Sequence, residues 1–508
     1  MKPQPGISRP SSFLAHLIVA ALFLVGIGAA FAARAPYLLN SDALYLPSLF
    51  SSIRSGQDLR LFSFPPSPYL FPDLLIHFLC VVLAPSLIWA AVFVAVLQVA
   101  LFCLAALRLG KHIGIELSGA EITFILAPFA AWLFVESQFD FPIFMMSLLS
   151  AHHFGIVLLT LWSLCALFSR QKLLFAVCVA LGVISDPLFL PLFVVPIACA
   201  LFLTNLEIAD RKTSLKPALL AASLLGALAY YCLRHFFYFV TLPPTDASRL
   251  SAMAQAAREL SSDLLQDPLL IPAYAFGVLA SVGALLKRPT ANIKLLCTTL
   301  LLLVAASFLA PILLAFYRNG AERYLMPGAI LSALTGQLIA ARSLQGRKVY
   351  LSFVGAAYVV AAVPFLPYKA MSLSSSELVP PIVRCLDARL SDLSAKRGLG
   401  DYWLAKQVSY LSSVGLKVDE VRSDFAPFDH LNNLEQFLNP ATGKGWDYDF
   451  IIMRRLDVGR ATELFGKPDF SFLCGRSAIW VYRAPRHLDD LEREVQARIA
   501  ELSAGKKF

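Results

Sequence analysis

Long apolar segments constrain this chain more than any other feature. Water cannot hydrogen-bond the backbone inside a bilayer, so stretches of about 20 apolar residues fold as membrane-spanning helices. The composition agrees, because 58% of the residues are hydrophobic and only 15% are charged, whereas a soluble domain has about 25% charged residues. We predict eleven spans at residues 13–34, 86–106, 120–134, 154–168, 173–185, 188–204, 217–240, 270–286, 293–316, 324–341 and 349–367.

Basic residues predict the orientation of these spans. Cytoplasmic loops carry an excess of Lys and Arg, and every second loop here is basic if residues 71–84 do not cross. That segment is short, contains Asp73 and His77 and ends at Pro85, which favours an interfacial or re-entrant helix. The net charge of +9 therefore reflects topology rather than nucleic-acid binding. The basic residues are Arg108 and Lys111; Arg170 and Lys172; Arg211, Lys212 and Lys216; Lys287, Arg288 and Lys294; Arg342, Arg347 and Lys348.

The chain divides into a membrane domain, residues 1–367, and a soluble domain, residues 368–508. The second part alternates helical and strand patterns, which indicates a small α/β domain. We predict helices at 400–415, 430–438 and 487–502, and strands at 416–421, 448–455 and 477–483. The fold class is thus an α-helical polytopic membrane protein with a C-terminal soluble α/β domain. The positive-inside rule places the N-terminus in the cytoplasm and this domain on the outer side.

Nine cysteines occur in the chain, but only Cys385 and Cys474 fall in the soluble domain. An oxidising outer compartment permits a disulfide, and a bond requires Cα atoms within about 7 Å. We predict that the two residues pair, although the sequence does not decide it. No C-x-x-C pair indicates zinc.

Acidic and basic residues gather at the predicted outer ends of the spans. Asp42 follows the first span, where it could act on a substrate at the membrane surface or simply cap a helix as part of Asn40-Ser41-Asp42. Arg323 lies at the edge of a later span, where it could bind phosphate through its planar fork or mark the interface by snorkelling. Arg318 is a second candidate for phosphate.

The second outer loop contributes Glu136, Asp140, His152 and His153. These side chains could simply be solvated, or one carboxylate, Glu136 or Asp140, could work beside Asp42, since carboxylates in different environments can separate acid and base roles. Adjacent histidines point apart in a strand or loop, so we predict no metal site there.

Three stretches resemble the GT-C superfamily of membrane glycosyltransferases, the class that includes protein O-mannosyltransferases and lipid A aminoarabinose transferases. They are SDALY after the first span, PPSPYLFPDLLIHFL leading to a span that ends in RLGKHIG, and ERYLMPG. The resemblance covers roughly residues 13–367. It departs from the family at Phe64-Pro65-Pro66, where the usual motif is His-Pro-Pro.

The resemblance implies inverting transfer of a sugar from a polyprenyl-phosphate donor, without a cofactor, to an acceptor lipid, glycan or protein of the cell envelope. Asp42 would be the general base, with Glu136 or Asp140 assisting, and Arg323 or Arg318 would bind the donor phosphate. We also predict substrate contacts from a further set of side chains, namely Tyr45, Asp73, His152 and His153. The enzyme would lie in the inner membrane, with membrane lipid around it and its C-terminal domain in the periplasm.

Two other readings fit the same sequence. A transporter or flippase for a lipid-linked substrate should carry charged or broken helices near the bilayer midplane, often in repeats. No internal repeat is evident here, and the charges lie at the predicted outer edge. A non-catalytic membrane assembly protein would use the C-terminal domain to bind a partner.

Overall fold

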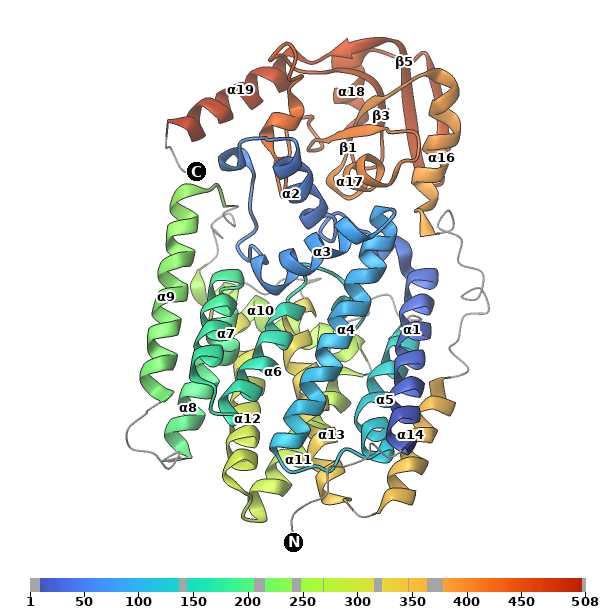
Figure 1. The fold of residues 1–508 in the computed structure, drawn as a ribbon. Coiled ribbons are helices and arrows are strands. Elements are labelled where there is room, and N and C mark those ends of the chain that lie inside the picture. The colour runs from blue at the N-terminus through green and yellow to red at the C-terminus, as the bar shows by residue number, and fades with distance from the viewer. Residues whose placement is uncertain are drawn as a thin grey trace.

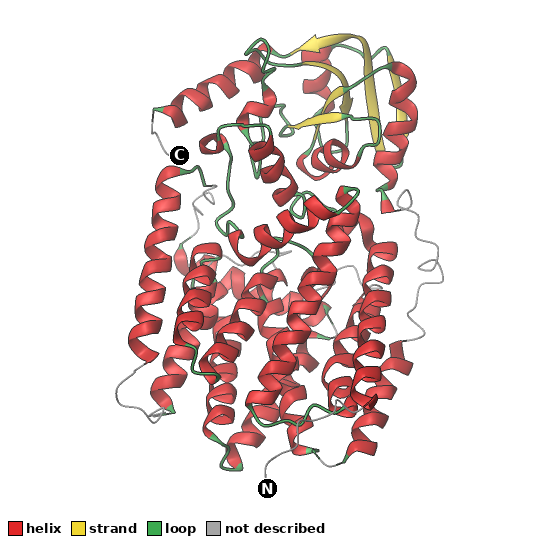
Figure 2. Cartoon of the chain, viewed as in Figure 1, coloured by secondary structure: helices red, strands yellow, loops and turns green. Residues whose placement is uncertain are grey.

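The computed structural model of the protein describes residues 10–136, 144–204, 215–239, 248–267, 269–314, 322–345, 347–362 and 378–504. A bundle of helices forms one end of the molecule, and the C-terminal α/β domain covers the other end (Figure 1, Figure 2). Within these ranges all five named strands belong to the C-terminal domain. The predicted boundary at residue 367 lies outside the described residues, between the last helix of the bundle and the first of the domain.

Each of the eleven predicted spans coincides with a helix. The helices are α1 (Pro10–Leu38), α4 (Leu87–His112), α5 (Gly119–Glu136), α6 (Phe154–Phe168), α7 (Lys172–Ser185), α8 (Val195–Leu203), α9 (Leu215–Phe236), α11 (Leu270–Leu286), α12 (Ala291–Leu313), α13 (Met326–Ser343) and α14 (Lys348–Ala362). An additional amphipathic helix, α10 (Arg249–Gln266), lies between α9 and α11 in the chain.

Fewer helices than eleven are long enough to cross a membrane by themselves. Among the described residues, five helices, α1, α4, α5, α9 and α12, meet the requirement of length and apolar composition. The pair α10 and α11, bent by 94°, would make a sixth if it formed one broken span. The prediction of eleven full spans is not met on this measure, because a helix such as α6, with 15 residues, is only about 22 Å long and the hydrocarbon core is about 30 Å thick.

The outer surface of the bundle is apolar, as lipid contact requires. On α9, which lies at the edge of the bundle (Figure 1), four leucines are 60–62% exposed, namely Leu220, Leu224, Leu225 and Leu228. Apolar patches of this kind on a soluble monomer would promote association. Together with the apolar helices, they indicate a multi-pass membrane protein.

The segment after α1 folds back along the end of the bundle. It begins with the short helix α2 (Tyr45–Arg54). The segment at 71–84 forms a turn of π-helix, η2 (Leu70–Leu74), and α3 (Leu75–Leu83). With nine residues, α3 is about 14 Å long and cannot cross a bilayer. It therefore agrees with the prediction that this segment does not span the membrane.

The C-terminal domain contains a five-stranded mixed sheet with the order β2-β1-β3-β5-β4. Strand β1 pairs in parallel with β2 and β3, while β5 is antiparallel to β3 and β4. The strands are β1 (Arg397–Gly400), β2 (Lys417–Glu420), β3 (Asp447–Ile452), β4 (Phe470–Cys474) and β5 (Ser477–His487). The helices are α16 (Pro381–Leu390), α17 (Tyr402–Leu411), α18 (Val458–Phe465) and α19 (Asp489–Ser503).

The predicted helix at 430–438 is wrong apart from one turn of 3₁₀-helix, η9 (Leu434–Phe437). Asn433 explains the difference, because its side chain competes with helix formation by bonding to nearby and distant backbone. Its Oδ1 accepts a hydrogen bond from the backbone N–H of Glu435 at 2.9 Å, and its Nδ2 donates to the carbonyl of Asp58 at 3.1 Å.

The predicted disulfide is confirmed. Cys385 and Cys474 are bonded, with Cα atoms 5.7 Å apart. The bond joins α16 to β4 and so fastens this helix to the edge strand of the sheet.

The first loop and the C-terminal domain lie on the same end of the bundle and bind one another. The Ser41 hydroxyl donates to the carbonyl of Tyr402 at 2.5 Å. The Gln407 amide donates to the carbonyls of Pro36 and Leu39, each at 3.1 Å. These bonds fix α17 over the end of α1, which is the arrangement on which the candidate site depends.

Four of the predicted cytoplasmic loops meet at the opposite end of the bundle (Figure 1). The His112 ring bonds to the Ser169 hydroxyl at 2.9 Å, and the His112 carbonyl accepts from Asn292 at 3.0 Å. Arg342 donates to the carbonyl of Ile113. The basic residues near these positions therefore share one end of the molecule, away from the C-terminal domain.

Candidate functional site

Asp42 lies in the turn between α1 and α2, and it does not serve as the cap that its sequence context allowed. Asn40 instead bonds to the backbone of this turn, because its Oδ1 accepts from the backbone N–H of Ala43 at 2.9 Å. No side chain caps the start of α2. The carboxylate of Asp42 is therefore left to bind groups from other parts of the chain.

Two distant residues bind the Asp42 carboxylate. Arg323 Nη1 lies 3.2 Å from Oδ2, and the Tyr402 hydroxyl donates to Oδ1. Arg323 comes from the turn η5 (Glu322–Tyr324) just before α13, and Tyr402 is the first residue of α17. The side chains of Asp42 and Arg323 are 20% and 32% exposed, so a ligand can reach the pair. The predicted base and the predicted phosphate ligand are thus neighbours, and the C-terminal domain supplies a third member.

The surroundings keep Asp42 ionised. Burial is the largest influence and would raise its pKa, but the Arg323 guanidinium, His152, the Tyr402 hydrogen bond and His430 together outweigh burial, so the pKa lies below its ordinary value. Burial, with the Arg323 charge, lowers the pKa of His152 to about 4. Burial also lowers the pKa of His430 to about 4, despite the pull of Asp42. At neutral pH the carboxylate is therefore charged and both imidazoles are neutral.

His153 belongs to a second cluster behind Arg323. Its Nδ1 lies 2.5 Å from Oδ2 of Asp186, and its Nε2 lies 3.1 Å from the Tyr69 hydroxyl. The Tyr324 ring lies between the two clusters. The centroid of this ring is 5.0 Å from the centroid of the His153 ring and 5.5 Å from the Cζ of Arg323. Asp186 also accepts from the Ser67 hydroxyl at 2.8 Å, so this second cluster is closed by its own hydrogen bonds.

The two adjacent histidines interact with different groups. His152 interacts electrostatically with Asp42 and Arg323, whereas His153 binds Asp186. Among the residues that the structure describes, no group of three His, Cys, Asp or Glu side chains is arranged to hold a metal ion.

Three other predicted site residues take part in packing. Asp73 is 1% exposed, and its Oδ1 accepts from the backbone N–H of Ala151 at 3.2 Å. Tyr45 is also 1% exposed, and its hydroxyl donates to the carbonyl of Pro68 at 3.1 Å. Glu136 is fully buried at the end of α5, where it accepts from the backbone N–H of Met145 at 2.9 Å. Asp140 and Arg318 lie outside the described residues.

The sequence analysis missed most of the C-terminal domain's contribution. Tyr402 and His430 approach Asp42 from that domain, and Tyr69 and Asp186 hold His153. Only Asp186 had a visible signal, since it is a charged residue between two apolar segments. Tyr402 lies 360 residues from Asp42 in the chain, and no local pattern reports such a pairing.

Comparison of the chain with protein-family models, curated proteins and solved structures gave no match. The functional argument therefore depends on the residues themselves, and the resemblance to the GT-C superfamily stays an expectation from sequence.

Proposed function

We propose that this protein is a membrane glycosyltransferase that transfers a sugar from a polyprenyl-phosphate-linked donor to an acceptor lipid, glycan or protein. The observation that supports the proposal is the partly exposed Asp42–Arg323 pair at the end of an apolar helical bundle. A carboxylate and a guanidinium at that depth match the two tasks of the reaction, which are proton removal and phosphate binding.

The reaction follows from the chemistry of these two groups. Asp42 accepts the proton of an acceptor hydroxyl, and the resulting oxygen attacks the anomeric carbon of the donor. The bond between that carbon and the phosphate oxygen breaks, and the electron pair leaves with the polyprenyl phosphate. Arg323 stabilises the negative charge on the departing phosphate. One sugar–oxygen bond forms as another breaks, with inversion at the anomeric carbon.

The residues around the pair affect the orientation of Asp42 and the local charge. The Tyr402 hydroxyl binds Oδ1 of Asp42 and so orients the carboxylate. His152 and His430 are neutral at pH 7, because burial lowers the pKa of each to about 4. Neutral imidazoles add no second cation, so Arg323 is the principal partner of Asp42 and the natural ligand for an incoming phosphate.

A second candidate, a non-catalytic assembly protein, has one observation in its favour. Both oxygens of Asp42 already have partners, and one of these partners belongs to the C-terminal domain. The same bonds would arise if Asp42 served only to attach that domain to the bundle. The two candidates differ in what they predict for a variant that keeps the shape of Asp42.

The test is sugar transfer by Asp42→Asn, measured in a purified, folded preparation with a polyprenyl-phosphate sugar donor. The amide keeps the size of the side chain but cannot act as a base, so turnover should fall by about 10²–10⁴. Asp58→Asn is the matched control, because Asp58 lies in the same loop and pairs with exposed Arg60 at 2.6 Å. Turnover of Asp42→Asn close to that of the control would favour the assembly protein.

We also propose that the protein lies in the inner membrane, with the C-terminal domain in the periplasm. The Cys385–Cys474 disulfide supports an oxidising side for that domain, and the basic end of the bundle supports a cytoplasmic position for the other end. Single cysteines at exposed Ser51 and Ser394 should react with an impermeant thiol reagent in intact cells, and one at exposed Lys287 should not. The opposite pattern would contradict this orientation.

A further inference from the structure

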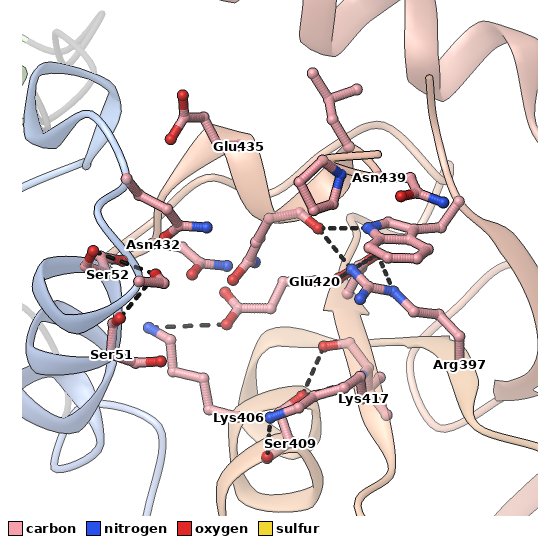
Figure 3. Close-up of a pocket in the computed structure, with 18 of the residues that line it drawn as sticks. Ser51, Ser52, Arg397, Lys406, Ser409, Lys417, Glu420, Asn432, Glu435 and Asn439 are labelled. Carbon is pink, nitrogen blue, oxygen red and sulfur yellow. Dashed lines mark hydrogen bonds and ion pairs between the residues drawn. The ribbon is translucent and has the colours of Figure 1, made fainter. Parts of the chain in front are cut away.

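A polar cavity lies between α2 of the first loop and the C-terminal domain, away from the Asp42 pair. Its volume is about 600 Å³, which is within the usual range of about 300–1,000 Å³ for small-molecule sites. Serines of α2 face strand β2 and the segment before η9 across this space (Figure 3). Neither domain forms the cavity alone, so it exists only because the two are joined.

The lining of the cavity holds equal numbers of basic and acidic side chains, namely Arg397, Lys406, Lys417, Asp419, Glu420 and Glu435. Arg397 and Asp419 form a bidentate pair with distances of 2.7 and 3.2 Å, and Lys406 lies 3.7 Å from Glu420. The Lys417 ammonium donates to the carbonyl of Ser409 at 3.1 Å. Basic and acidic side chains thus balance in number, and a ligand that enters the cavity does not meet a field of one sign.

Two buried side chains in the wall have hydrogen-bonding atoms without a protein partner. Oε2 of Glu420 and Nδ2 of Asn432 each lack one, although the two residues are only 1% and 2% exposed. The rest of Asn432 is engaged, because its Oδ1 accepts from Ser48 at 3.4 Å. Buried polar atoms usually have partners, so two such atoms without partners beside an open cavity point to a polar ligand that supplies them.

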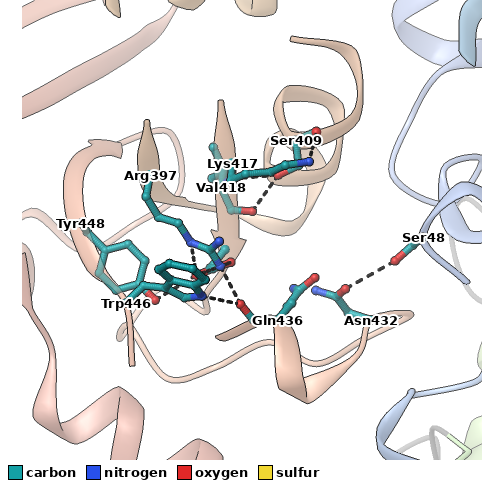
Figure 4. A network of polar contacts seen from close by, with 10 residues as sticks. Ser48, Arg397, Ser409, Lys417, Val418, Asn432, Gln436, Trp446 and Tyr448 are labelled. Atoms are coloured by element: carbon teal, nitrogen blue, oxygen red, sulfur yellow. Dashed lines mark hydrogen bonds and ion pairs between the residues drawn. The ribbon is translucent and has the colours of Figure 1, made fainter. Parts of the chain in front are cut away.

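An ordered aromatic ring completes the lining. Trp446 lies with the Arg397 Cζ 4.1 Å from its ring centroid, and its Nε1 donates to the carbonyl of Gln436 at 2.9 Å. Figure 4 shows this network, in which Trp446, Arg397 and Gln436 hold one another in place. A fixed aromatic edge offers apolar contact to the C–H groups of a ligand, while amides and hydroxyls bind its polar groups.

We propose that this cavity is a binding site for a short uncharged glycan, which serves as the acceptor of the sugar. Sugars combine the two properties that the lining matches, namely many hydroxyl groups without net charge and a carbon skeleton that packs on an aromatic ring. The acceptor role, but not the binding itself, rests on the proposed transferase function. Lys406 lies between the cavity and the catalytic pair, since its Nζ lies 5.0 Å from the centre of the Tyr402 ring that reaches Asp42, so the acceptor glycan must extend past Lys406 to bring a hydroxyl to Asp42.

Saturation-transfer NMR on the full-length protein tests the binding directly. The probes are three uncharged trisaccharides, maltotriose, cellotriose and chitotriose, with trigalacturonate as an anionic probe of similar size. At least one neutral trisaccharide should bind. Ser51→Trp, which fills the cavity from an exposed position on α2, should weaken its affinity by at least about tenfold. Ser503→Trp, at the exposed end of α19, is the matched control and should bind as the unmodified protein does.

Two outcomes would overturn the binding site. One is that none of the neutral trisaccharides binds, or that Ser51→Trp and Ser503→Trp bind them equally. The other is that trigalacturonate binds more tightly than every neutral probe, which would assign the cavity to an anionic ligand.

The acceptor role has a separate readout. In a transfer assay, Ser51→Trp should raise KM for the glycan acceptor with little change in kcat, and Asp42→Asn should keep glycan binding while it loses turnover. Glycan binding without any transfer would contradict the proposed transferase function but not the glycan site. Transfer with an unchanged acceptor KM in Ser51→Trp would contradict only the acceptor role of this cavity.

Discussion

Two acid–base pairs lie at the junction of the bundle and the C-terminal domain, and they differ mainly in access. Asp42 and Arg323 are 20% and 32% exposed, whereas Lys406 and Glu420 are each 2% exposed. Burial raises the pKa of Glu420 to about 8 and lowers the pKa of Lys406, so both charges are weakened. Burial raises the pKa of Asp42 too, but Arg323, His152, Tyr402 and His430 together outweigh burial, and the pKa is lowered. Pairing alone therefore does not identify a reactive group; solvent access and a stable charge do.

The largest effect should come from breaking the buried pair. Lys406→Met leaves Glu420 without its cation and removes the bond from Nζ to the Leu431 carbonyl at 2.8 Å. Loss of one partner from a buried pair costs about 3–5 kcal/mol, so the free energy of unfolding should fall by that amount in denaturant titrations. Lys417→Met, an exposed lysine of the same cavity, should change it by less than about 1 kcal/mol. Equal effects of the two variants would show that burial does not distinguish the pairs.

Arg323→Lys should weaken the binding of the donor rather than the fold. Lysine keeps the positive charge but loses the planar fork that holds phosphate through two bonds. The affinity for a polyprenyl-phosphate donor should fall by at least about tenfold, while the melting temperature stays close to that of the unmodified protein. Unchanged donor affinity in Arg323→Ala would reduce this residue to an anchor at the membrane interface.

Tyr402→Phe should shift the pH profile of transfer. The hydroxyl stabilises the charged form of Asp42, so its removal raises the pKa of the carboxylate. The acid limb of kcat/KM should then move to higher pH by about one unit. A lower rate with an unshifted acid limb would mean that Tyr402 acts only by attaching the C-terminal domain.

The smallest expected effect concerns stability in mild acid. The pKa values of His152 and His430 are about 4 in the folded protein and about 6.5 in the unfolded chain. Between these values the unfolded chain binds protons that the folded state excludes, so stability falls as the pH drops from about 6.5 to 4. His430→Gln should lose less melting temperature than the unmodified protein between pH 7 and pH 5. An identical loss would indicate that His430 protonates freely in the folded state.

The helices of the bundle could be predicted from the sequence, because apolar runs report lipid-facing and buried helices directly. The predicted segments 154–168 and 270–286 match α6 and α11 residue for residue. The number of crossings could not be predicted in the same way, because several helices are too short to span a bilayer alone.

In the C-terminal domain, the interior strand β1 escaped prediction for a packing reason. β1 is the four-residue segment RGLG, which has no β-branched residue. Gly398 is needed there, because a Cβ at that position would lie 2.4 Å from the Phe450 ring of the neighbouring strand. β1 forms a strand because it pairs with β2 and β3 on either side. The alternation of residues within a four-residue segment is too short to predict this pairing.

The candidate site was half predictable for a related reason. Asp42 and Arg323 stand out as charged residues at the ends of apolar segments, and that is a local signal. Tyr402, His430 and Lys406 belong to a helix and a loop whose local pattern is that of any soluble domain. Their position beside Asp42 depends on how that domain docks on the bundle, which only the folded chain reveals.

The central claim is that the exposed pair, and not the buried one, is the reactive site. A cryo-EM structure of the protein with a bound polyprenyl phosphate tests it most directly. The account predicts phosphate oxygens about 3 Å from the Arg323 guanidinium, with Asp42 facing the same space and Lys406 still beside Glu420. A phosphate bound elsewhere, with the Asp42–Arg323 contact unchanged at 3.2 Å, would contradict the account.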